Sequence, residues 1–145
     1  GKMIYATEKG LYWNIMKPFE VVYVFTENGM LQAEDNQRTV IPAEEYPLFM
    51  EFSQIFQSIF SGNYDELAKY FEIFFTNNNG KWTLGLRPLN IIIMTVITDI
   101  TITGGKNIET ISFTETNGDS TKIQLLNIDS GAKALSKEQE NYFVF

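Results

Sequence analysis

The sequence offers few residues of the types that catalyse reactions or bind metals. It contains no cysteine and no histidine among its 145 residues. Their absence removes the thiolate nucleophile, the imidazole general base and the commonest metal ligand. Two pairs of neighbouring carboxylates, Asp65 with Glu66 and Glu138 with Glu140, have the residue types for acid–base chemistry. Solvated surface charge is the simpler interpretation of both pairs, and we expect no enzyme activity and no cofactor.

Two asparagine-rich turns are the remaining candidates for a chemical role. Asn77–Gly80 and Asn117–Asp119 carry oxygen atoms that could in principle bind a cation. Calcium loops, however, need more carboxylates at defined spacing. We therefore expect no metal site.

The composition favours a compact domain that binds neither nucleic acid nor an anionic surface. The net charge is −7, which repels phosphate backbones and anionic membranes. The longest apolar run, Ile91–Ile97, is interrupted by Thr95 and is too short to cross a bilayer. The chain length fits a single domain spanning residues 1–145. Aromatic residues make up 14% of the chain, so large rings either fill its core or line a cavity.

The elements that would position these rings are mostly strands. Alternating apolar residues and turn residues between Lys2 and Glu34 predict antiparallel hairpins. The segment Phe19–Phe25 is apolar on both faces, which predicts a strand covered on both sides. A short strand is expected at Arg38–Ile41. Because the chain begins within a strand at Lys2–Ala6, we expect an exposed sheet edge and self-association through Met3, Ile4 and Tyr5.

A change to helical spacing predicts one amphipathic helix over Tyr46–Ser61. Apolar residues recur there at intervals of three and four: Leu48, Phe49, Phe52, Ile55, Phe56, Ile59 and Phe60. Pro47 suits the first turn of a helix and Gly62 suits its end. The bulky face of this helix is either part of a filled core or a lid over a cavity.

Two further hairpins are predicted in the second half of the chain, each with large apolar residues on one face. A four-residue loop at Asn77–Gly80 and a three-residue loop at Asn117–Asp119 set their expected registers. The expected pairs are Phe75 with Trp82, Ile73 with Leu84, Phe71 with Leu86, Phe113 with Ile123 and Ile111 with Leu125.

The rest of the chain completes the predicted sheet. Leu89–Thr103 is expected to break near Val96 and to continue as a strand over Thr98–Thr103. After a polar stretch, Tyr142–Phe145 is expected to form a terminal strand. The predicted architecture is α+β: a meandering antiparallel sheet, or half-open barrel, with one long helix on its concave face.

Several motifs, taken in order, resemble the bacterial outer-membrane lipoprotein carriers (LolA-like proteins). The opening strands carry Lys9-Gly10-Leu11-Tyr12-Trp13, Lys17-Pro18-Phe19 and Val24-Phe25-Thr26. The later ones carry Lys81-Trp82-Thr83-Leu84, Arg87-Pro88, the isoleucines 97, 100 and 102, and Asn117-Gly118-Asp119-Ser120-Thr121. The resemblance covers nearly the whole chain. It implies a half-open β-barrel with a helical lid around a hollow for acyl chains, a periplasmic location, and partner proteins that release cargo at the inner membrane and accept it at the outer membrane.

The sequence departs from the carriers in two places. The N-terminal helix and first strand of the family have no counterpart here, and Thr7 stands where the family has an arginine that helps govern cargo transfer. The role of that arginine is therefore not carried over. The chain shows no signal peptide, and we expect that a leader was removed or trimmed.

These considerations give one set of candidate residues and two functions. The apolar residues expected to line a lipid-binding cavity are Leu11, Trp13, Val22, Val24, Phe49, Phe52, Ile55, Phe56, Ile59, Ile73, Phe75, Trp82, Leu84 and Leu86. The expected function is that of a periplasmic carrier for the acyl chains of lipoproteins or other lipids. The alternative is a protein-binding or structural β-module with a filled core, which self-associates through its exposed strand edge.

Overall fold

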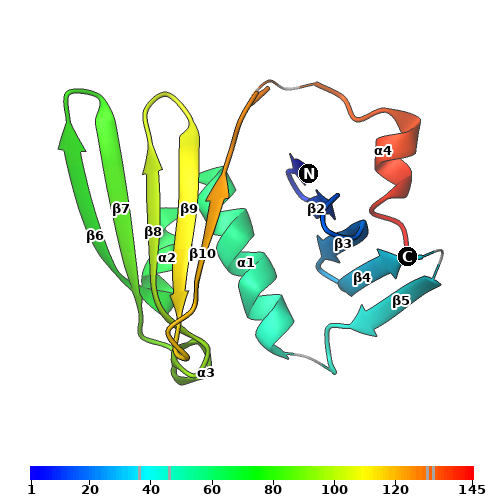
Figure 1. Cartoon of the computed structure of the whole chain (residues 1–145), viewed down its shortest axis with the longest axis horizontal. Coiled ribbons are helices and arrows are strands. Elements are labelled where there is room, and N and C mark those ends of the chain that lie inside the picture. The colour runs from blue at the N-terminus through cyan, green and yellow to red at the C-terminus, as the bar shows by residue number, and fades with distance from the viewer. Residues whose placement is uncertain (36, 46, 130, 132) are drawn as a thin grey trace. The chain divides into compact units, whose positions relative to one another are not determined.

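The computed structural model is a mixed α+β structure with two antiparallel sheets of five strands each and four short helices (Figure 1). It describes residues 1–35, 37–45, 47–129, 131 and 133–145, and within the first helix it describes side chains from residue 51 onward. The chain divides into two compact units, unit 1 comprising Gly1–Asn63 with Lys133–Phe145, and unit 2 comprising Tyr64–Ala132. The expected α+β class with antiparallel sheets is confirmed.

The expectation of one meandering sheet is wrong. Sequence neighbours pair throughout each sheet, but the fifth and sixth strands are separated by two helices and do not pair with each other. A hairpin forces its two strands together, whereas a helical connection leaves them free to join different sheets.

The first sheet, in unit 1, is a simple meander. Its strands are β1 (Lys2–Ala6), β2 (Gly10–Ile15), β3 (Val21–Thr26), β4 (Gly29–Glu34) and β5 (Gln37–Pro42), in that spatial order. Gly10 and Gly29 begin β2 and β4 at φ of 131° and 147°. A Cβ atom at either position would collide with the carbonyl oxygen of the neighbouring strand. These hairpins therefore require glycine.

Both faces of this sheet are covered by other segments of unit 1. Helix α1 (Pro47–Ser61) packs against β2 and β4, and the ring of Phe60 stacks on Tyr5 of β1 with 5.6 Å between centroids. The other face is covered by the segment after helix α4 (Lys137–Asn141). The expectation that Phe19–Phe25 is a strand covered on both sides is confirmed for β3, which begins at Val21, but Phe19 precedes the strand and its side chain is 73% exposed. Tyr46, where the helix was expected to begin, lies outside the described residues.

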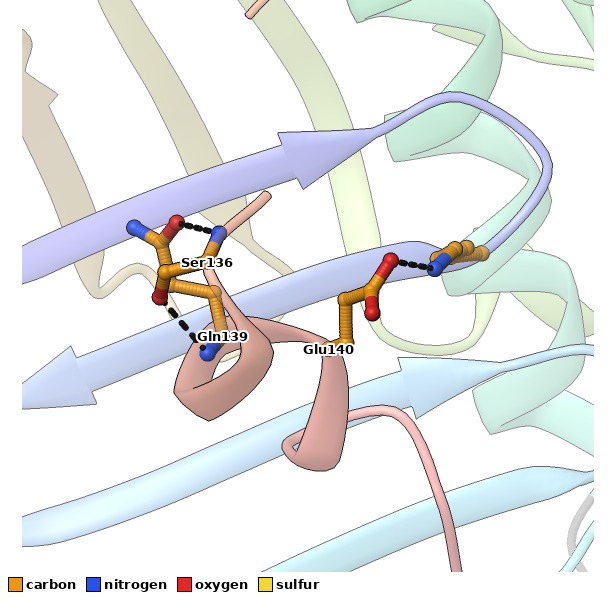
Figure 2. Close-up of polar contacts among 4 residues, drawn as sticks. Ser136, Gln139 and Glu140 are labelled. Carbon is orange, nitrogen blue, oxygen red and sulfur yellow. Dashed lines mark hydrogen bonds and ion pairs between the residues drawn. The ribbon is translucent and has the colours of Figure 1, made fainter. Parts of the chain in front are cut away.

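The C-terminal segment of unit 1 is a capped helix followed by aromatic residues. Figure 2 shows the capping box of α4, in which Ser136 Oγ accepts from the Gln139 backbone N–H at 3.1 Å and Gln139 Oε1 accepts from the Ser136 N–H at 2.9 Å. The figure also shows the ion pair of Glu140, whose partner is Lys9 Nζ at 3.1 Å in the β1–β2 turn. The expected terminal strand is wrong, because Tyr142–Phe145 lies on the face of the sheet and is not a strand.

The second sheet, in unit 2, is a meander as well. Its strands are β6 (Phe71–Asn78), β7 (Lys81–Pro88), β8 (Ile97–Gly104), β9 (Ile108–Glu115) and β10 (Ser120–Gln124), and their spatial order is β10-β9-β8-β7-β6. Helix α2 (Tyr64–Tyr70) precedes β6, and the short helix α3 (Ile91–Met94) connects β7 to β8. The expected break near Val96 is confirmed.

Both expected registers in this sheet are wrong by two residues. Phe75 pairs with Leu84, Ile73 with Leu86 and Phe71 with Pro88, because the first turn has two loop residues, Asn79 and Gly80, both at positive φ. In the second hairpin Phe113 pairs with Thr121 and Ile111 with Ile123. A shift of two keeps every side chain on its expected face, since strand side chains alternate with a period of two.

Candidate functional site

One face of the sheet in unit 2 is lined almost entirely by apolar residues. Two rows of paired residues cross all five strands from β6 to β10. One row is Ile73, Leu86, Ile100, Phe113 and Thr121, and the other is Phe75, Leu84, Ile102, Ile111 and Ile123. We call these ten residues the apolar face. It brings together four of the predicted cavity residues, namely Ile73, Phe75, Leu84 and Leu86.

Exposure of the apolar face changes from its centre to β6. Leu84, Leu86 and Ile102 are almost fully buried. Ile73 is half-buried, and Phe75 is 56% exposed. Because β6 is an edge strand, the apolar face ends at an accessible aromatic ring. This edge is where an apolar ligand would first contact the sheet.

The opposite face of the same strand is chemically different. Phe74 is 47% exposed, and the guanidinium carbon of Arg87 lies 5.0 Å from the centre of its ring. Arg87 Nη1 also donates to Glu72 Oε2 at 3.1 Å. Phe74 thus belongs to a polar surface and is engaged in a cation–π contact. Phe74 and Phe75 form a natural comparison, since they are adjacent rings of similar exposure on opposite faces.

Trp82 has a structural role at the end of β7. Its indole Nε1 donates to the carbonyl oxygen of Gly105 at 2.8 Å, and its ring occupies the space that a side chain at Gly104 would need. The position pairs with Asn77 and Gly104, outside both rows of the apolar face. The N–H group is therefore satisfied by the backbone of the β8–β9 connection.

The predicted cavity residues of the first sheet do not share one surface. Leu11 and Trp13 lie on the face toward which α1 packs, whereas Val22 and Val24 lie on the other face. Val24 belongs to the core cluster that the C-terminal aromatic residues cover, and Val22 packs against that cluster. No single ligand surface in unit 1 can include all four side chains.

The predicted residues of α1 divide by burial. Ile55 and Ile59 are buried, while Phe52 and Phe56 are half-buried. The Phe56 ring stacks on Phe60 at 6.4 Å between centroids. The side chain of Phe49 lies outside those that the structure describes. Helix α1 thus brings four of its five predicted side chains into partly or fully buried positions.

Several titratable groups of the described residues form ion pairs at the surface. Glu66 accepts from Lys69 Nζ at 2.6 Å, and this contact raises the pKa of Lys69. Glu138 accepts from the Tyr142 hydroxyl at 3.4 Å. Burial, together with the charge of Glu138, raises the pKa of Tyr142. Within the described ranges no group of three or more potential metal ligands occurs.

One surface feature was missed by the sequence reasoning. Leu89, Ile91, Ile92 and Met94 all have exposed side chains in and around α3, which lies in the β7–β8 connection. The run of apolar residues after Pro88 is visible in the sequence, where it predicts a break near Val96 but no helix. Asn90 is the signal that could have identified a helix start, since its side chain caps α3.

Comparisons with known proteins give no assignment. The chain matches no protein-family model and no curated protein. In the portion that the structure describes, no helix is both long enough and apolar enough to cross a bilayer.

Proposed function

We propose that the chain is a non-enzymatic carrier that binds acyl chains against the apolar face of unit 2. The observation that supports this most directly is the pair of apolar rows, which cross five strands and end at the exposed ring of Phe75 on β6. The two rows are apolar throughout except for Thr121 at the far edge. Since Leu84, Leu86, Ile100, Ile102 and Ile111 are already buried in the structure, an acyl chain would first meet this face at the exposed ring of Phe75.

The energetics of such a surface are sufficient for a carrier. Each methylene group removed from water contributes about 0.8 kcal/mol, so ten methylenes contribute about 8 kcal/mol before the cost of association. Binding of this kind requires no catalytic group, in agreement with a sequence that lacks histidine and cysteine. The net result is moderate affinity for many related chains and little selectivity among them.

The finer parts of the proposal rest on the resemblance to the outer-membrane lipoprotein carriers. They are the half-open barrel with a helical lid, the periplasmic location, lipoprotein cargo, and partner proteins at the two membranes. None of these is needed for the acyl-binding test.

The test compares two neighbouring phenylalanines. A fluorescent hydrophobic probe is titrated into the protein and then displaced with a fatty acid. We expect saturable binding near one-to-one stoichiometry, and we expect Phe75→Ser to weaken it about tenfold, since a large ring contact is lost. Phe74→Ser is the matched control and should leave probe affinity unchanged, because that ring lies on the polar face. Absence of saturable binding, or equal effects of the two substitutions, would refute the proposal.

A second function is favoured by a different observation. Leu84, Leu86 and Ile102 are as deeply buried as core residues, and β1 is an edge strand of the first sheet. Both features fit a protein-binding or structural module with a filled core that pairs through its edge. Under this function the probe does not bind saturably, and the protein self-associates as its concentration rises.

A further inference from the structure

The strand β6 is the longest and the least protected of the four edge strands. Edge strands are usually kept from pairing with other molecules by a short length, a basic residue, a proline or a bulge. β1, β5 and β10 have five or six residues, and they carry Lys2, Arg38 and Lys122 respectively. β6 has eight residues without lysine, arginine or proline, and it pairs with β7 without a bulge. Its one charged residue, Glu72, is already paired with Arg87 of β7.

Most of the outer edge of β6 is accessible. Phe71, at the start of the strand, is buried, so its backbone groups cannot reach a partner. Glu72 and the residues Phe74–Asn78 are exposed, and Ile73 between them is half-buried. We call Glu72–Asn78 the open edge. Figure 1 shows β6 as the last strand of its sheet, with no helix or strand of unit 2 beyond it.

The turn after β6 determines which backbone groups of the open edge point outward. Because Asn79–Gly80 forms a two-residue loop at positive φ, the closing pair of Asn78 and Lys81 exchanges hydrogen bonds, and so does every second pair before it. The hydrogen bond from Leu89 N–H to Tyr70 O, at 2.8 Å, continues this alternation. The residues in between direct their N–H and C=O groups away from β7, where no other strand of the described residues pairs with them: Ile73, Phe75 and Asn77.

A second copy of the open edge is complementary to the first in one antiparallel register. When Phe75 lies opposite Phe75 of the second copy, Ile73 lies opposite Asn77 of that copy. Every outward residue of both chains then exchanges hydrogen bonds with a partner. A shift of two residues in either direction places an outward residue opposite the buried Phe71 or opposite Asn79 in the turn. The backbone therefore favours the register with a two-fold axis at Phe75.

The side chains are compatible with this register. On the apolar face the two Phe75 rings lie next to each other, and each ring covers part of the other's 56% exposed surface. On the polar face Phe74 lies opposite Thr76, and Glu72 lies opposite Asn78, so charges of the same sign do not face each other. These matches follow from the sequence of β6 itself, and they favour a second copy over an unrelated peptide.

We propose that two copies of the protein form a dimer by antiparallel pairing of their open edges, which joins two sheets of five strands into one sheet of ten. The two-fold axis uses both open edges, so assembly through β6 ends at the dimer. A single strand pair is a small interface, and we expect a dissociation constant on the order of 100 μM. The net charge of −7 on each copy opposes the dimer, and salt strengthens it by screening. The dimer does not depend on acyl binding.

The first experiment makes use of a chain without cysteine. Residues of a hydrogen-bonded antiparallel pair have Cα atoms about 5.5 Å apart, a distance that a disulfide bridges. Phe75→Cys should therefore form a disulfide-linked dimer on mild oxidation of lipid-free protein. Asn77→Cys is the matched control, on the same face of the same strand. The two cysteines of its dimer lie about 13 Å apart along the strands, so we expect cross-linking at least about tenfold slower.

The second experiment tests the position of the two-fold axis by exchange of charge. Phe75→Lys and Phe75→Glu should each weaken the dimer, because two like charges then face each other. An equimolar mixture of the two variants should associate more strongly than either alone in analytical ultracentrifugation. The same pair of substitutions at Asn77, which lies opposite Ile73, should show no such difference. Circular dichroism verifies that each variant is folded.

A third variant separates the dimer from acyl binding. Asn77→Pro removes an outward N–H that β7 does not use, so it should weaken the dimer and leave the hairpin intact. Probe affinity at about 1 μM protein, well below the expected dissociation constant, should be unchanged. A protein that cross-links through Phe75→Cys but binds no probe would contradict the proposed function and support the dimer. Equal cross-linking of Phe75→Cys and Asn77→Cys, or a charge mixture no stronger than its components, would overturn the dimer. A monomer whose β6 pairs only with an extended segment of another protein would overturn it too.

Discussion

The aromatic contact between Tyr142 and Tyr12 should determine whether the C-terminal segment stays on its sheet. The two rings stack with 4.2 Å between centroids and 18° between planes. Tyr12 is buried together with Val24 and Leu31, and Phe143 packs on the same cluster. Replacing a fully buried aromatic ring by alanine costs about 3–5 kcal/mol, and Tyr142 is half-buried. We therefore expect Tyr142→Ala to lower the free energy of unfolding of unit 1 by about 2 kcal/mol, of which the ring pair supplies about 1 kcal/mol.

The two tryptophans allow this loss to be assigned to one unit. Trp13 lies in unit 1 and Trp82 in unit 2, and the chain has only these two. Urea denaturation in a Trp82→Phe background follows the fluorescence of Trp13 alone. Val144→Ala, at an exposed position of the same segment, is the control and should change stability by less than about 0.5 kcal/mol. If Tyr142→Ala behaves like Val144→Ala, the segment does not stabilise the sheet and the reasoning is wrong.

The same residue gives a pH dependence with a defined sign. The pKa of Tyr142 is raised in the folded protein because burial and the nearby Glu138 carboxylate disfavour the phenolate. The unfolded chain therefore loses this proton first, near the ordinary tyrosine pKa of about 10. The neutral hydroxyl of Tyr142 therefore makes its full contribution to the free energy of unfolding below about pH 10, and this contribution is lost as the pH rises through the pKa of the folded state. Tyr142→Phe should show a smaller alkaline loss of stability than the unmodified protein in urea midpoints measured between about pH 8 and 11.

Three further outcomes follow from the sheets. Leu86→Ala should lower the free energy of unfolding by about 3 kcal/mol in urea denaturation, because the Leu86 side chain is almost fully buried. Leu89→Ala, at an exposed position, should lower it by less than about 0.5 kcal/mol, and equal losses in the two variants would contradict this reasoning. Gly80→Ala should cost about 1 kcal/mol, because φ is 78° in the two-residue turn, and an unchanged midpoint would argue against that turn. The outer edge of β1 pairs with no other strand among the described residues, so we expect self-association through Met3–Tyr5 that strengthens with salt in analytical ultracentrifugation; a monomer at high salt and tens of micromolar protein would contradict it.

The faces of the strands could be predicted from the sequence, but the cross-strand pairs could not. Alternation of side chains in β6 and β7 assigns Ile73, Phe75, Leu84 and Leu86 to one face for any loop with an even number of residues. The register depends instead on the turn. Asn77–Gly80 permits loops of four or two residues, and both place the same side chains on the same face. The choice is made by Asn79 and Gly80, which adopt the left-handed conformation and allow two more residue pairs to form.

Element boundaries with a local chemical signal were also predictable. Helix α1 ends where expected, because Gly62 takes φ of 69° while its N–H donates to Ile59 O and that of Asn63 to Ser58 O. Helix α3 was not expected, since a run of three β-branched isoleucines followed by methionine has the composition of a strand. The cap at Asn90 and the buried side chain of Ile93 outweigh that propensity, which is a weak effect for one turn.

The fate of Tyr142–Phe145 shows why composition alone cannot predict tertiary position. An aromatic and β-branched run of this kind has the composition of a strand, as we expected, and the outer edge of β1 is a place where such a strand could pair. Each backbone hydrogen bond gained by such pairing contributes about 1 kcal/mol net, and a short strand forms only a few. Placing Tyr142, Phe143 and Phe145 against Tyr12 and Val24 removes three large side chains partly from water, at about 1.5–3 kcal/mol for each ring that is fully buried. The Lys9–Glu140 ion pair and the capping box fix the helix that delivers them. Burial on the face therefore outweighs pairing at the edge. Among the described residues no strand pairs with the outer edge of β1, and we expect the protein to self-associate through this edge.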